Sequence, residues 1–81
     1  MTTLVISADS ALVAGALERL GDDDLIVLEG SADVLERMEG EFADPRVWFL
    51  IGDAEVIPLP DRCVDSVVGD SVSPEVDRVV R

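Results

Sequence analysis

Two acidic residues, Glu29 and Asp53, each follow an apolar run of the sequence directly, at a point where a strand would end. A carboxylate in the position of Glu29 is able to accept hydrogen bonds from both hydroxyls of a ribose, which makes it a candidate for binding a nucleoside. The alternative for Glu29 is a solvated carboxylate favoured by the dipole of a following helix. For Asp53 the alternative is a structural role, because aspartate ends strands in many folds.

Few other groups in the chain have the chemistry needed for catalysis. There is no histidine and only one cysteine, Cys63, so the sequence excludes an imidazole base and an internal disulfide, and a metal would need carboxylates alone. We predict neither a catalytic residue nor a metal ligand, and we expect Cys63 to be a small buried hydrophobic residue. Asp9 and Asp53 allow a remote alternative, a phosphoreceiver-like domain in which two carboxylates hold magnesium; the absence of lysine argues against it.

Four apolar segments are predicted to be strands, and they lie at residues 4–7, 25–28, 47–51 and 64–68. The first three are apolar at successive positions, which is typical of parallel strands covered on both faces. Trp48 and Phe49 belong to the third segment, and both are expected to pack in the core.

Helical periodicity predicts a helix at residues 11–20, capped by Asp9 or Ser10, and a second one that begins after Ser31. A short C-terminal helix is predicted to start at Pro74. With right-handed crossovers, the fold class is α/β: half of a Rossmann-like three-layer sandwich, with a parallel sheet in the order 3-2-1-4, two main helices and a short C-terminal helix. At 81 residues, the chain is predicted to be a single domain, residues 1–81.

Two segments resemble class I S-adenosylmethionine-dependent methyltransferases of the ubiquinone/menaquinone-biosynthesis type. The first, at residues 52–67, reads GDAEVIPLPDRCVDSV and is similar to the family's GDAExLPFPDxSFDxV. The second, at residues 29–38, reads EGSADVLERM and is similar to DxSPEMLERA, with Glu29 in place of aspartate. The chain's last four residues, RVVR, also look like the RVLR that ends a helix in this family.

This resemblance implies S-adenosylmethionine as the cofactor and a cofactor-binding set consisting of Glu29, Gly30, Asp53 and Ala54. By position, Glu29 would bind the ribose, Asp53 would accept a hydrogen bond from the adenine amino group, and the backbone N–H of Ala54 would contact the ring. A typical domain of the family is more than twice as long as this chain, so the resemblance implies a truncated domain.

The first strand-to-helix turn departs from the family, which has GxGxG there to let the backbone approach the cofactor. This chain has no glycine before Gly15, and Asp9 adds a carboxylate that would repel the carboxylate of the cofactor. Binding of S-adenosylmethionine is therefore predicted to be weak or lost. We expect a methyltransferase-like domain that is non-catalytic on its own and acts as an interaction or regulatory module. The alternative is a weak S-adenosylmethionine or nucleoside-binding module that a partner chain completes.

The net charge of −12 makes nucleic acid and anionic membranes poor partners, and it also fits a salt-loving host. Because a truncated sheet would expose its edges, we expect a homodimer or a partner protein to cover them. No apolar run reaches the roughly 18 residues needed to span a membrane, and the first residues, MTTLVISAD, lack the features of a signal peptide. A cytoplasmic location is the expectation.

Overall fold

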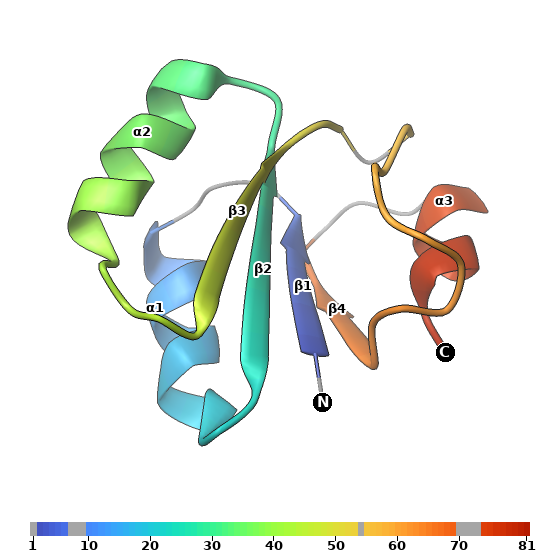
Figure 1. Cartoon of the computed structure of the whole chain (residues 1–81), viewed down its shortest axis with the longest axis horizontal. Helices are drawn as coiled ribbons and strands as arrows, with labels where there is room; N and C mark the ends of the chain where they lie inside the picture. The colour runs from blue at the N-terminus through green and yellow to red at the C-terminus, as the bar shows by residue number, and fades with distance from the viewer. Residues whose placement is uncertain (1, 7–9, 54, 70–73) are drawn as a thin grey trace.

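The computed structural model describes residues 2–6, 10–53, 55–69 and 74–81. Its elements, in chain order, are β1 (Thr2–Ile6), α1 (Ser10–Leu20), β2 (Asp24–Glu29), α2 (Ala32–Glu41), β3 (Val47–Ile51), β4 (Ser66–Val68) and α3 (Pro74–Val79). The strands form one four-stranded sheet in the order β3-β2-β1-β4, and every pair of neighbouring strands is parallel (Figure 1). The predicted fold class and strand order are confirmed.

The sheet separates two clusters of buried side chains. On one face, α1 and α2 pack against alternate residues of the strands, such as Val5 and Val27. On the other face, α3 and the segment at residues 57–64 pack against the intervening residues, such as Leu4 and Leu28. Figure 1 shows α1 and α2 on the left of the sheet and α3 on its right. Both faces of the central strands are covered, which explains why their sequences are continuously apolar.

The helices begin and end close to the predicted points. Ser31 caps α2, with its Oγ accepting a hydrogen bond from the Val34 N–H at 3.5 Å. Gly21 follows α1 with a φ of 64°, a left-handed conformation that suits glycine. Pro74 is the first residue of α3, as predicted, whereas the proposed cap Asp9 lies outside the described residues.

The fourth strand is shorter than predicted, because Val64 pairs instead with Val80 in an isolated bridge. Between Val64 and β4, Asp65 joins the segment to the first strand. The Thr2 N–H donates to Asp65 Oδ2 at 2.7 Å, and the Asp65 N–H donates to the Thr2 carbonyl oxygen at 2.8 Å. Asp65 is therefore a structural hydrogen-bonding residue that connects this segment to β1.

An ion pair fixes the connection between α2 and β3. The Arg46 side chain donates to both oxygens of Asp44, with Nε–Oδ1 at 2.9 Å and Nη2–Oδ2 at 2.7 Å. The same guanidinium also donates to the Gly21 carbonyl oxygen, at the end of α1. These hydrogen bonds from Arg46 lower the pKa of Asp44 to about 2.

Among the described residues, no helix is long and apolar enough to cross a membrane.

Candidate functional site

The two segments that carry the predicted site lie next to each other at the carboxyl ends of β2 and β3. The Gly52 N–H donates to the Glu29 carbonyl oxygen at 3.0 Å, and a Cβ built on Gly30 would lie 3.7 Å from the Gly52 carbonyl oxygen. This is the edge of a parallel sheet at which α/β folds bind ligands. The structure thus brings Glu29, Gly30, Gly52 and Asp53 together, while Ala54 lies outside the described residues.

The half-buried side chain of Glu29 hydrogen-bonds to its own turn. Its Oε1 accepts from the Gly30 N–H at 3.0 Å and from the Ser31 N–H at 3.3 Å. The carboxylate therefore stabilises the entry into α2, where the helix dipole also favours a negative charge. A ribose that used this oxygen would compete with two backbone donors.

Asp53 is exposed and holds the turn that follows β3. Its Oδ1 accepts from the Glu55 N–H at 2.8 Å and from the Val56 N–H at 3.0 Å. This is the pattern by which aspartate stabilises turns through its own backbone. The geometry accounts for Asp53 structurally, as it does for Glu29. Both candidate carboxylates have a local role that needs no ligand.

Gly52 is required where the loop at residues 57–61 turns back over the sheet. A Cβ at this position would lie 2.9 Å from Pro58 Cδ, closer than real Cβ atoms approach, and 3.1 Å from Leu28 Cδ1, which is tighter than most Cβ contacts. Pro58 and Pro60 are exposed, whereas Ile57 is buried at 3% exposure and anchors the loop in the core. The proline-rich segment is thus fixed at one end by packing against Gly52 and Leu28.

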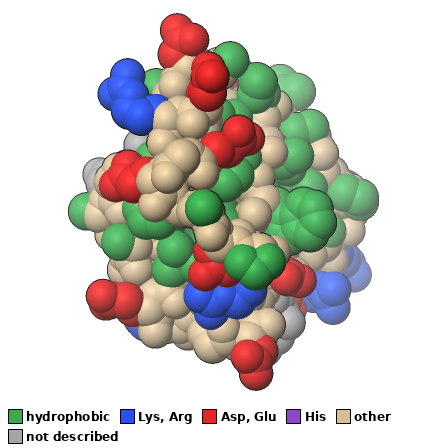
Figure 2. Space-filling model, turned by 60° about the vertical axis from the view of Figure 1, so that its left-hand side comes forward, with side chains coloured by type: hydrophobic (Ala, Val, Ile, Leu, Met, Phe, Trp, Pro, Cys, Tyr) green, Lys and Arg blue, Asp and Glu red, His purple; other side chains and the backbone are tan. Residues whose placement is uncertain are grey.

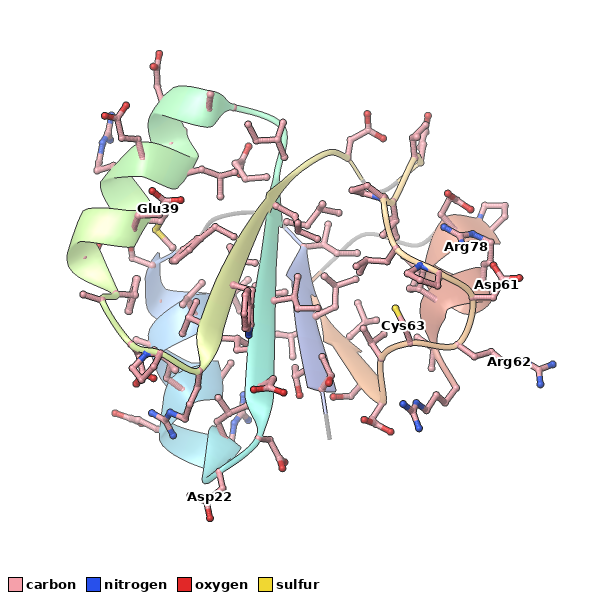
Figure 3. All side chains as sticks on the ribbon, viewed as in Figure 1. Asp22, Glu39, Asp61, Arg62, Cys63 and Arg78 are labelled. Carbon is pink, nitrogen blue, oxygen red and sulfur yellow. The ribbon has the colours of Figure 1, made fainter. Side chains whose placement is uncertain are left out.

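Arg78 of α3 holds the other end of this loop. Its guanidinium donates to the carbonyl oxygens of Ile57 and Leu59 at 2.9 and 2.8 Å, and to Asp61 Oδ1 at 2.6 Å. It also forms an ion pair with Glu75, with Nε–Oε2 at 2.5 Å. Figure 3 shows Arg78 and Asp61 pointing toward each other, whereas Arg62 points away.

The pKa values of this cluster shift in the directions that hydrogen bonding dictates. The Arg78 guanidinium lowers the pKa of Glu75, and the Glu75 and Asp61 carboxylates raise the pKa of Arg78. Glu75 Oε1 also accepts from the Ile57 N–H at 3.1 Å. Sequence reasoning missed the role of this pair, although the i, i+3 spacing of Glu75 and Arg78 was a local signal.

Other predicted site features are absent or lie elsewhere in the described part of the chain. Cys63 is half-buried and packs against the hydrophobic core between the sheet and α3, in keeping with a structural role. The described residues contain no group of three or more acidic, histidine or cysteine side chains able to hold a metal ion. Asp9, on which the phosphoreceiver alternative depends, lies outside the described residues.

A cavity of about 260 Å³ lies at the amino ends of the strands, beside the end of α1. Its lining includes Thr3, Arg19 and Ser66, and the hydroxyl oxygens of Thr3 and Ser66 are 3.0 Å apart. The carboxyl ends that carry Glu29 and Asp53 are at the opposite end of the sheet. The cavity therefore contributes nothing to the predicted nucleoside site.

The prediction that Trp48 is a core residue is wrong. Its side chain is 61% exposed, whereas Phe49 packs against the core under α1 and α2 as expected. The Trp48 side chain lies on the face of β3 that is opposite α2. Residues 57–64 and α3 cover this face of the sheet over β1 and β2, but they leave the Trp48 side chain exposed. Ile51 and Val56, at 60% and 68%, are also exposed. We call the outer edge of β3 together with Trp48 and Ile51 the open side.

Comparison with known proteins assigns no family to this arrangement. No protein-family model matches the chain, and no curated protein matches it. The resemblance of residues 29–38 and 52–67 to methyltransferases therefore stays a prediction, carried by those residues alone.

Proposed function

We propose that this chain is a methyltransferase-like scaffold that transfers no methyl group by itself and acts as an interaction module through its open side. The observation that carries this proposal is the exposure of Trp48 on an edge strand. Aromatic residues are enriched in the buried centres of protein interfaces, and an unpaired strand edge offers backbone donors and acceptors to a partner. β3 has the sequence VWFLI, without the charged residues or proline that usually protect an edge.

The state of the candidate carboxylates supports a non-catalytic role. Glu29 and Asp53 each accept two hydrogen bonds from neighbouring backbone N–H groups, so both have a structural role that needs no cofactor. The sequence of the first strand-to-helix turn also supports a non-catalytic role, because it lacks the glycines that the methyltransferase family has there.

A photo-crosslinking experiment in the cells from which the chain comes tests this proposal. We expect p-benzoylphenylalanine in place of Trp48 to give a discrete covalent adduct on irradiation, because a partner covers that side chain. The same amino acid in place of Glu18, exposed on α1, is the control and should give none. If both positions give no adduct in a folded chain, the open side has no partner and the proposal fails.

A second candidate function is weak binding of S-adenosylmethionine or a related nucleoside, completed by a partner chain that supplies the acceptor site. The observation in its favour is the hydrogen bond that joins Gly52 to Glu29 and so brings both predicted segments to one edge of the sheet. In this candidate, Glu29 and Gly30 would lie at the ribose, and Asp53 and Ala54 at the adenine.

Calorimetric titration of S-adenosylmethionine and S-adenosylhomocysteine into the folded chain separates the two functions. We expect no heat of binding at ligand concentrations up to about 100 μM, because the first strand-to-helix turn has no glycine and Asp9 adds a carboxylate that would repel the carboxylate of the ligand. Binding that is tighter than this, and that Asp53→Ala removes, would establish the second candidate. Asp22→Ala is a control with the same change of charge in the exposed turn after α1, far from the candidate site.

A further inference from the structure

We propose that β3 pairs with β3 of a second copy of this chain, antiparallel and about a two-fold axis through Phe49. The two four-stranded sheets then form one continuous sheet. This inference rests on the proposed function and names the partner that the open side takes.

The hydrogen bonds at both ends of β3 determine which of its backbone groups point outward. The Leu25 N–H donates to the Arg46 carbonyl oxygen at 2.8 Å, and the Gly52 N–H donates to the Glu29 carbonyl oxygen at 3.0 Å. In a parallel ladder, the N–H and C=O of one residue point to the same side, and the side alternates along the strand. The even-numbered residues of β3 therefore face β2, and the odd-numbered ones face outward.

Phe49 is the central outward residue, so a two-fold axis through it lets each copy donate its Phe49 N–H to the Phe49 carbonyl oxygen of the other. The Val47 N–H already donates to the Asp44 carbonyl oxygen at 3.0 Å, but the Val47 carbonyl oxygen points outward. In this register it accepts from the Ile51 N–H of the second copy. The backbone groups of the edge are thus self-complementary when Phe49 is the centre.

The side chains are compatible with this register. Residues that lie opposite each other in an antiparallel pair share one face of the sheet. With Phe49 at the centre, Trp48 lies opposite Leu50 of the second copy, and both belong to the face that carries α3. On the other face, Ile51 lies opposite Val47. A shift of one residue would pair side chains from opposite faces, so it is excluded.

Charge decides between the antiparallel and the parallel arrangement. Arg46 precedes β3, whereas Asp53 and Glu55 follow it. Because Arg46 is already paired with Asp44, the amino end of β3 carries no excess charge; antiparallel pairing places the acidic carboxyl end of each strand beside this end of the other copy, whereas parallel pairing would place the two acidic ends together.

The rest of the surface opposes association at low salt. Each copy carries a net charge of −12, and the exposed residues of α2, beside the open side, are mostly acidic. Figure 2 shows hydrophobic side chains gathered along one side of this view, with acidic side chains beside them. Because the Debye length falls from about 10 Å at 0.1 M salt to a few ångströms above 1 M, association should strengthen as salt is added.

Sedimentation equilibrium in about 0.1 M and about 2 M KCl tests the proposal. We expect the mass to rise from 8.7 kDa toward twice that value at high salt, and the emission of the single tryptophan to shift to shorter wavelength. Trp48→Lys should leave a folded monomer at both salt concentrations. Ala14→Lys adds the same charge on the exposed surface of α1 and should dimerise like the parent chain. A parent chain that remains monomeric at high salt would overturn the inference.

Engineered cysteines test the register. In a Cys63→Ser background, Trp48→Cys combined with Leu50→Cys should give a disulfide between positions 48 and 50 of different copies, because opposed residues of this kind have Cα atoms about 4.5 Å apart. A disulfide that joins the two 48 positions instead would contradict the axis at Phe49. An adduct at Trp48 with another protein, in a chain that stays monomeric, would overturn the dimer and leave the proposed function intact.

Discussion

Gly69→Ala is expected to destabilise the domain by about 2–4 kcal/mol, enough to leave much of it unfolded at 37 °C. Gly69 follows β4 with a φ of 140°, a conformation that residues with a side chain rarely adopt. A Cβ there would also lie 2.8 Å from the Ile6 carbonyl oxygen, which belongs to the backbone of the central strand and is unable to move aside. Strain and steric conflict therefore add at one position.

Gly15→Ala is the matched control, because it makes the same chemical change in a different setting. Gly15 lies within α1, and a Cβ there would meet nothing within 4 Å. Alanine has the higher helix propensity, so this variant should gain about 0.5–1 kcal/mol. Urea denaturation of both variants, followed by circular dichroism, measures the two shifts. Equal stabilities for the two variants would contradict the close contact between Gly69 and Ile6.

Arg78→Lys is expected to lower the melting temperature by on the order of 10 °C, although it preserves the charge. Arg78 is bound at once to Glu75, Asp61 and two carbonyl oxygens of the loop at residues 57–61. An ammonium group has three donors and no planar fork, so lysine is unable to reproduce this set of hydrogen bonds. The loop should then separate from α3.

Amide hydrogen exchange shows where Arg78→Lys acts, because loss of protection confined to the loop differs from loss of protection throughout the domain. The Ile57 and Leu59 amides should lose protection before those of β1 do. Arg62→Lys is the control, since Arg62 is exposed and its side chain points away from the loop (Figure 3). If Arg78→Lys melts at the same temperature as Arg62→Lys, the guanidinium does not hold the loop.

The layers of the fold were predictable because they depend on local patterns. Continuous apolar runs indicated the parallel strands, and Ser31 and Pro74 marked the starts of two helices. The exposure of Trp48 was not predictable in this way. It depends on where the segment after β3 crosses the sheet and where α3 packs, and both are set by contacts distant in sequence.

The same distinction between local and distant contacts explains which parts of the candidate site were predictable. That Glu29 and Asp53 would both lie at the carboxyl ends of neighbouring strands followed from strand order, and the structure places them there. Their hydrogen bonds to their own turns join residues at most three positions apart, so spacing could have suggested them. The contacts of Arg78 with Leu59 and Ile57 span 19 and 21 positions, and no local pattern reports them.

The bond between Thr2 and Asp65 joins residues 63 positions apart, and this separation affects the order in which the domain assembles. β1 is an inner strand of the sheet, but its neighbour β4 is synthesised only after β2, α2 and β3. Such distant pairings slow folding, because the intervening chain has to lose its freedom before the contact forms. During synthesis, β1 therefore keeps one unpaired edge until β4 emerges, and in that interval the nascent chain is most exposed to misassociation.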